Sequence, residues 1–215
     1  MPHTATVTAL SDHHARNEGD GMQRILAAAL DLFAIHGFDQ VSVNAIADKA
    51  GVSKANVFHH FKSKNDLYLA TLREACRETR ESLDVLSGTD GDIGERLTRY
   101  MREHLLAMLR NEQETRLVLR EVLDNSPGKA RALAEDVFKD RFEILVGVIR
   151  ECQSKGLLRD GIDPAFVAVM LTGANVFYFQ SREIMRHFPG IDFATEPERY
   201  SEKFMDVLLN GIGVK

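Results

Sequence analysis

The 215-residue sequence has little cysteine, little proline and no long apolar run. Its two cysteines, Cys76 and Cys152, lie far apart in helical patterns, so we expect no disulfide framework, and a reducing cytoplasm fits best. Only 5 prolines accompany 44% hydrophobic and 27% charged residues, which excludes a disordered or collagen-like chain. The longest apolar stretch, residues 166–179, is shorter than the roughly 18 residues of a membrane span, so we expect no membrane partner. Residues 1–20 lack the apolar core of a secretory signal.

Signatures of enzymes are also missing. The sequence has no G-x-S-x-G, H-E-x-x-H or C-x-x-C motif, and no glycine-rich phosphate loop between a strand and a helix. We therefore expect no enzyme, no catalytic residue, no cofactor and no bound metal. A weak cluster of metal-ligand types (His3, Asp12, His13, His14) lies in a segment whose composition favours a flexible arm, and Arg16 of this arm could instead enter a DNA minor groove.

Apolar residues recur at spacings of three and four from residue 22 onwards, and no segment alternates in the manner of a β-strand. The expected fold is therefore all-α, preceded by the arm at residues 1–20. The pattern predicts helices over residues 21–36, 43–50, 54–61, 64–87, 97–108, 117–123, 129–155, 164–188 and 196–210. Gly37 and Gly51 are expected as left-handed stops, Ser42 and Ser53 as N-caps, and Ser63-Lys64-Asn65-Asp66 as a capping box.

The formal net charge of −5 argues by itself against a nucleic-acid binder, but the charge is unevenly distributed. Residues 49–64 carry four lysines and no acid, whereas the rest of the chain has 23 basic and 32 acidic residues. A basic island in an acidic body is typical of a contact with phosphates. An ordinary solvated face would have the same charge. Only the residues between the lysines can therefore distinguish a phosphate-binding surface from such a face.

Residues 46–61 have the spacing of a helix-turn-helix, in which a short helix, a tight turn and a second helix follow one another. In the turn, a left-handed Gly51 lets the helices cross steeply, Val52 fills the space beneath, and Ser53 caps the second helix. That helix is apolar on one side and polar or basic on the other. It can therefore enter the major groove of DNA, while Lys64 and the N-terminus of the next helix lie at the backbone.

Three motifs and a following pair resemble the DNA-binding signature of TetR-type transcriptional repressors: Val43-Asn44-Ala45-Ile46-Ala47, Ala50-Gly51-Val52-Ser53-Lys54, His59-His60-Phe61-Lys62-Ser63-Lys64 and Asp66-Leu67. The resemblance implies a helix-turn-helix DNA-binding domain at residues 21–66 and a helical regulatory and dimerisation domain at residues 67–215. It also implies a homodimer that binds a double-stranded DNA operator and an unknown small-molecule effector.

Carried over residue by residue, the resemblance implies a defined set of DNA contacts. Bases would be approached by Asn44, Lys54, Ala55 and Asn56, phosphates by Phe58, His59, His60 and Lys64, and the capping serines Ser42 and Ser53 complete the set. Phe58 stands where a tyrosine hydroxyl often donates to a phosphate, so that hydrogen bond is absent here. Either asparagine could instead be a solvated helix residue. The two adjacent histidines point about 100° apart and cannot share a metal ion without other ligands.

The C-terminal region carries weaker signals for an effector site and a dimer interface. Polar residues in apolar helices and a neighbouring methionine are the effector-site candidates: His104, Met108, Arg116, Asn175 and Tyr178. Small and apolar residues of two late helices are the interface candidates: Met170, Gly173, Ala174, Phe177, Phe204, Val207 and Leu208. A buried core would explain the same residues. The aromatic content permits a hydrophobic effector.

Together these features predict a cytoplasmic, homodimeric, ligand-responsive transcriptional regulator that represses from a palindromic operator. The fourth helix, residues 64–87, is expected to carry a ligand-induced change to the two reading heads, which are the DNA-binding domains (residues 21–66) of the two protomers. An alternative function uses the same reading head without an effector, in a DNA-bound architectural or division-coupled protein.

Overall fold

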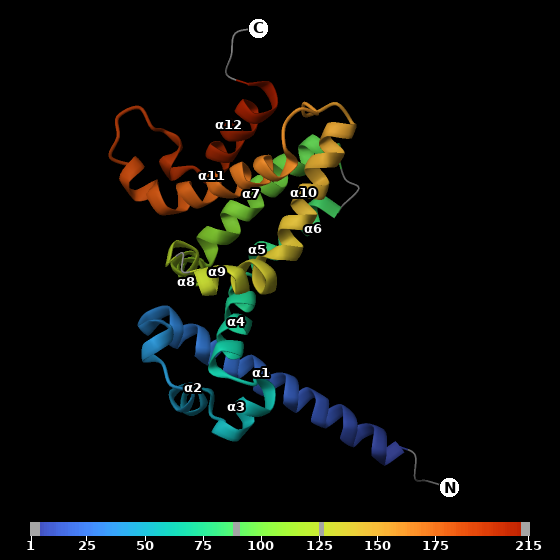
Figure 1. Ribbon diagram of the computed structural model, residues 1–215, viewed down its shortest axis with the longest axis vertical. Helices are drawn as coiled ribbons and strands as arrows, with labels where there is room; N and C mark the ends of the chain where they lie inside the picture. The colour runs from blue at the N-terminus through green and yellow to red at the C-terminus, as the bar shows by residue number, and fades with distance from the viewer. Residues whose placement is uncertain (1–4, 88–90, 125–126, 212–215) are drawn as a thin grey trace. The chain divides into compact units, whose positions relative to one another are not determined.

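The computed structural model describes residues 5–87, 91–124 and 127–211, which contain many helices and no strand, and this confirms the all-α fold (Figure 1). The chain divides into two compact units. The N-terminal unit comprises Met1–Ala75 and Arg116–Leu133, and the C-terminal unit comprises Cys76–Thr115 and Ala134–Lys215. Within the described ranges, every helix is too short or too polar to pass through a bilayer.

The N-terminal unit is built from the first helices of the chain and a later pair. Its elements are α1 (Ala5–Gln40), α2 (Val43–Ala50), α3 (Lys54–His60), α4 (Lys64–Ala75), the latter part of α8 (Glu112–Asp124) and α9 (Pro127–Ala132). Each of the first four helices contributes fully or almost fully buried side chains, among them Ile25, Phe33, Ile46, Val57 and Leu67. Burial of this apolar surface is the main source of the stability of the unit.

The first helix begins earlier than predicted. It starts at Ala5, whereas residues 1–20 were expected to form an arm without regular structure. Extending an existing helix is easier than starting one, so the strong pattern after residue 21 can support helix in the preceding residues that lack an apolar period. At its other end, Gly37 interrupts α1 with a φ of 77°, which confirms the expected stop because a positive φ favours glycine. The candidate metal ligands and Arg16 lie outside the residues whose side chains are described.

The C-terminal unit is built around α7 (Ile93–Arg110). Around it in the chain are α5 (Arg77–Glu81), α6 (Asp84–Ser87), the π-helix η1 (Leu133–Phe138), α10 (Lys139–Ser154), α11 (Pro164–Met185), the short η2 (Phe193–Thr195) and α12 (Pro197–Asn210). One core cluster joins buried residues of α7, α10, α11 and α12, including Leu97, Met101, Ile149, Leu171 and Met205. The Asp92 side chain and Glu95 form a capping box that begins α7.

The predicted single helix over residues 64–87 is wrong, because the chain forms three shorter helices there. Cys76 separates α4 from α5 with φ −88° and ψ 0°, outside the helical region. The Thr79 hydroxyl donates to the Cys76 carbonyl at 2.9 Å, and the Ser82 hydroxyl donates to the Thr79 carbonyl at 2.6 Å. Such side-chain bonds compete with the backbone ladder of a helix, which explains why the apolar period alone misled the prediction.

Candidate nucleic-acid interface

The turn between α2 and α3 has the geometry that the sequence predicted. Gly51 adopts the left-handed conformation, with φ 66° and ψ 37°, and the Val52 amide donates to the Ala47 carbonyl at 3.0 Å. This pair of features closes the C-terminal end of α2 in a Schellman-type cap. The Ser53 hydroxyl then accepts a hydrogen bond from the Asn56 amide at 3.1 Å and begins α3. The turn is therefore fixed at both ends by local contacts.

The predicted DNA-binding residues lie mostly on the solvent side of these helices. Seven of them are exposed: Ser42, Asn44, Ser53, Lys54, Ala55, Phe58 and His59. Phe58 exposes 44% of its surface. Val57 of α3 and Phe61, which follows the last residue of α3, are buried. The exposed side of α3 is thus free to meet a partner.

Asn56 and His60 lie differently from the other predicted residues. Both are half-buried, and a Cβ atom placed on Gly21 of α1 would lie 3.8 Å from the Asn56 amide oxygen and 3.8 Å from His60 Nε2. The Asn56 oxygen is buried and accepts no hydrogen bond within the part of the chain that the structure describes. These two side chains lean on α1, so a contact between the Asn56 oxygen and a base would require a change of rotamer.

The four lysines of the basic island are placed in different surroundings. Lys49 forms an ion pair with Asp31 at 3.0 Å, and the Lys64 ammonium lies 4.3 Å from the centre of the Phe38 ring. Lys54 and Lys62 are exposed, and neither makes an ion pair with another described residue. Two of the four positive charges are therefore held against the protein, while Lys54 and Lys62 point their full charge at solvent.

The start of α4 confirms the predicted capping box. The Ser63 hydroxyl accepts from the Asp66 amide at 3.0 Å, and the Asp66 carboxylate accepts from the Lys62 amide at 3.0 Å. The returning bond comes from the residue before the cap, so the box is one residue wider than the usual pattern. It fixes the N-terminus of α4 next to α3, where its unpaired amides and positive dipole are available to a phosphate.

Sequence analysis missed the residues that attach α8 to the reading head. The Arg120 guanidinium donates to the Phe33 carbonyl at 2.7 Å and to the Ala34 carbonyl at 3.3 Å, close to the point where Gly37 interrupts α1. Glu121 beside it is only 6% exposed and pairs with Lys129 at 3.5 Å. Burial, and then the neighbouring Glu121 carboxylate, raise the pKa of Tyr68 in α4. No local sequence signal could have found contacts between residues so far apart.

The structure brings together two of the five effector-site candidates. His104 and Asn175 are buried, and the Asn175 amide nitrogen lies 2.9 Å from His104 Nδ1 and donates to the Met101 carbonyl at 3.0 Å. Because that nitrogen donates, Nδ1 of His104 must accept and the ring is neutral. Burial, followed by the charge of Arg141, lowers the pKa of His104 to about 3.

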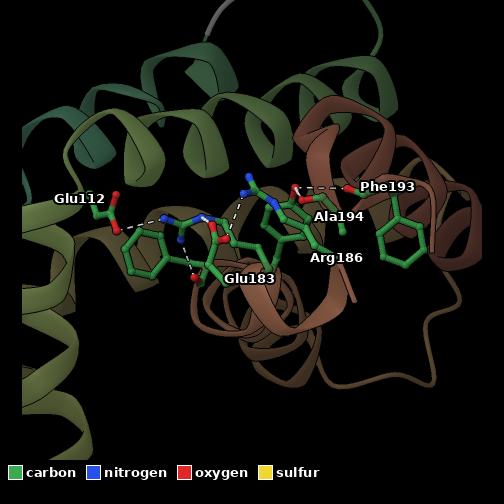
Figure 2. Close-up of polar contacts among 8 residues, drawn as sticks. Glu112, Glu183, Arg186, Phe193 and Ala194 are labelled. Atoms are coloured by element: carbon green, nitrogen blue, oxygen red, sulfur yellow. Dashed lines mark hydrogen bonds and ion pairs between the residues drawn. The ribbon is translucent and has the colours of Figure 1, made fainter. Parts of the chain in front are cut away.

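The other effector-site candidates have different environments. The Tyr178 hydroxyl donates to the carbonyls of Phe193 and Ala194 at 3.2 and 3.0 Å, so it holds the segment between α11 and α12 (Figure 2). Met108 is buried in α7, and Arg116 falls in the N-terminal unit. One turn after Tyr178, Arg182 pairs with Glu112 at 3.0 Å and ties α11 to the first residue of α8 (Figure 2).

The C-terminal unit has a groove of about 620 Å³ between α7 and α12, lined by Glu95, Thr98, Arg99, Arg102 and Glu202 among others. It holds none of the five effector-site candidates.

The interface candidates divide into exposed and packed residues. Met170, Gly173, Phe177 and Val207 are exposed, with Phe177 at 64%. The remaining three, Ala174, Phe204 and Leu208, pack against the core cluster. Further exposed apolar residues continue the first group along α11, namely Phe166 at 58%, Val169 at 57% and Ile184 at 61%.

Two family models match the chain. The model described as "Bacterial regulatory proteins, tetR family" matches residues 25–71, and the model described as "Tetracyclin repressor-like, C-terminal domain" matches residues 94–206. The two matches lie on the helix-turn-helix with its flanking helices and on most of the C-terminal helices.

Individual proteins are similar over most of the chain. The fatty acid metabolism regulator protein of Bacillus subtilis is 24% identical over 150 residues, which are 70% of this chain and 77% of that protein. The structure of FadR from Bacillus subtilis in complex with stearoyl-CoA has a TM-score of 0.70 at 18% identity and covers 89% of this chain and 99% of its own. The structure of AibR in complex with isovaleryl coenzyme A and operator DNA has a TM-score of 0.64 at 21% identity, with 88% and 98% covered. These structural likenesses show a shared fold.

Proposed function

Because this chain belongs to the TetR family of bacterial regulatory proteins and is a DNA-binding transcriptional regulator, we propose that it is a repressor released from its operator by an acyl-coenzyme A thioester. The observation that carries the DNA-binding part is the exposed side of α3 with its free lysine, fixed behind a left-handed Gly51. Its named relatives are transcriptional regulators, which are not enzymes.

We assign the DNA contacts to three neighbouring surfaces of the reading head. Lys54 and Ala55 are exposed in the first turn of α3, and we propose that they approach base edges in the major groove. We propose that Phe58, His59 and Lys64 contact the phosphates, together with the N-terminus of α4. Asn44 at the start of α2 is exposed and joins this surface, while Asn56 and His60 serve mainly to pack α3 against α1.

The dimer that a palindromic operator requires would form through α11. Its exposed apolar residues Phe166, Val169, Met170, Phe177 and Ile184 recur at spacings of three, one and multiples of about 3.5, so they lie on one face of the helix. Exposed contiguous apolar faces mark interaction surfaces, and a two-fold axis lets the same face serve both copies. We expect Phe177→Glu to give a monomer with weak operator binding, measured by sedimentation and by fluorescence anisotropy. Thr172→Glu, on another side of α11, is the control and should remain a dimer.

The effector class comes from the relatives. Two proteins of the same fold are described with stearoyl-CoA and with isovaleryl coenzyme A, and the first relative named above is a fatty acid metabolism regulator. The buried apolar interior of the C-terminal unit, with its polar pair His104 and Asn175, is compatible with an acyl chain that carries a polar head.

The experiment that tests this proposal starts with an operator selected from random DNA. The purified protein bound to that operator is then titrated with stearoyl-CoA, isovaleryl-CoA, free stearate and coenzyme A alone. We expect release by at least one of the two thioesters and none by coenzyme A. Binding that stays unchanged with both thioesters would refute the effector class while leaving the DNA-binding activity intact.

A further inference from the structure

An arginine of α10 contacts the turn at Cys76, the first residue of the C-terminal unit. The chain passes from the N-terminal to the C-terminal unit at Cys76, directly after α4. Arg141 donates from Nη1 to the Cys76 carbonyl at 3.2 Å and to the Thr79 hydroxyl at 3.2 Å. The same carbonyl accepts from the Arg80 amide at 2.9 Å and from the Thr79 hydroxyl. Arg141 therefore clamps the turn that breaks the long helix predicted from the sequence.

Within the described ranges of the chain, Arg141 forms no ion pair with a carboxylate. Its polar contacts include the Cys76 carbonyl, the Thr79 hydroxyl and the Cys76 thiol, and its guanidinium lies 5.5 Å from the centre of the Phe138 ring. Arg141 as a whole residue is half-buried. A partly desolvated cation that contacts only neutral groups is strongly stabilised when it forms a charge-assisted hydrogen bond with an anionic oxygen.

A buried polar cluster lies within range of this charge. Arg141 contributes to the lowered pKa of His104 and, against the larger effect of burial, opposes the rise in the pKa of Tyr100. Tyr100 and His104 lie on successive turns of α7, with ring centres 5.5 Å apart. Asn175 completes the cluster from α11, is fully buried, and has an amide oxygen that accepts no hydrogen bond from any described residue. An unsatisfied buried acceptor among neutral polar groups marks a place where a ligand can add a donor.

We propose that Arg141 is a latch, which holds the Cys76 junction in the operator-binding form and is taken over by an anionic oxygen of the effector. The inference rests on the proposed function for the identity of the effector as an acyl-coenzyme A. The shared chemistry is a phosphate or carboxylate oxygen, which matches the two-pronged guanidinium. Once that oxygen binds Arg141, the Cys76 carbonyl and the Thr79 hydroxyl lose their clamp, and the junction directly behind α4 is free to change. The bond from Thr79 to the Cys76 carbonyl remains in both states.

The test compares Arg141→Ala and Arg141→Lys with the wild type and with Arg150→Ala, which removes an exposed arginine from the same helix. Stearoyl-CoA and free stearate are the probes, since one offers phosphates and the other a carboxylate. We expect Arg141→Ala to weaken binding of the effective probe by at least tenfold, because about one charge-assisted contact is lost. Arg141→Lys should reduce the affinity for this probe by a smaller factor, and Arg150→Ala should leave it unchanged.

The clamp is tested separately, without any effector. Hydrogen exchange of the Arg80 amide, which donates to the Cys76 carbonyl, should become faster in Arg141→Ala, and operator affinity should fall about tenfold. If Arg141→Ala binds the effective probe as tightly as the wild type, or if exchange at Arg80 is unchanged, the latch is refuted. If stearoyl-CoA, isovaleryl-CoA and free stearate all leave the wild type unchanged, the proposed effector class and the anion part of the latch both fail, and the exchange measurement still decides the clamp.

Discussion

The buried His104 ring makes the stability of the protein depend on pH in a calculable way. Burial first, and the charge of Arg141 second, lower the pKa of His104 from 6.5 to about 3. Between pH 6.5 and about pH 3, His104 is protonated in the unfolded chain and neutral in the folded chain. The folded state therefore loses stability as the pH falls below 6.5, and the loss grows down to about pH 3. From pH 7 to pH 5 this single group should remove roughly 2 kcal/mol from the free energy of unfolding.

The assay is urea unfolding at pH 7 and pH 5 of the wild type and of His104→Gln, which keeps a polar side chain but cannot titrate. We expect the variant to be less stable at pH 7, because the contact with Asn175 is disturbed, yet to lose about 2 kcal/mol less than the wild type on acidification. The exposed His36→Gln is the matched control and should keep the wild-type pH dependence. Equal pH dependence in wild type and His104→Gln would show that this ring is not buried in neutral form.

Four further substitutions probe the reading head. Lys64→Ala should weaken binding to all DNA and lower the slope of log affinity against log salt by about 1. Lys54→Ala should weaken binding to the operator more than binding to random DNA. Equal effects of the two substitutions would contradict the roles proposed for these lysines. Arg120→Ala removes two bonds to α1 carbonyls and should lower the free energy of unfolding by about 1 to 2 kcal/mol, seen as a lower urea midpoint. Gly51→Ala forces an alanine to a φ of 66° and should lower the free energy of unfolding by about 1 to 2 kcal/mol. Gly147→Ala, at an exposed position of α10, should raise it; the reverse order would be inconsistent with the turn geometry.

The helix-turn-helix could be predicted from sequence because its determinants are local. Ser42, Gly51, Ser53 and Asp66 each act on a neighbour within a few residues, through caps and one left-handed turn. Rules for such contacts need only spacing and residue type, so they can be read without knowing the fold. The caps and the turn of the helix-turn-helix were accordingly predicted correctly.

The features that sequence analysis missed depend on distant residues. The break at Cys76 is held by Arg141, which lies 65 residues along the chain, and Arg120 bonds to a carbonyl 87 residues before it. The orientation of Asn56 toward Gly21 depends in the same way on how α3 packs against α1. Helical periodicity reports which face of a helix is apolar, but it does not report which polar group of another helix will meet it.

The interface candidates of α11 and α12 are a third case. The sequence identified the apolar residues correctly, but it did not show which of them are exposed and which are packed in the core. Met170 and Phe177 are exposed, whereas Phe204 and Leu208 pack into the core of their own unit. An apolar stripe has the same sequence pattern whether it faces its own core or a second copy. Only the three-dimensional structure separates the two kinds of residue.

The most direct test of the central claim is a competition assay with purified protein at moderate ionic strength. A labelled duplex selected from random sequences is bound, and either the unlabelled duplex or a scrambled duplex of the same composition is added. The account predicts that the selected duplex competes at least about 1,000-fold better and contains inverted half-sites about one helical turn apart or slightly more. Equal competition by both duplexes would contradict the assignment of α3 as a sequence-reading helix.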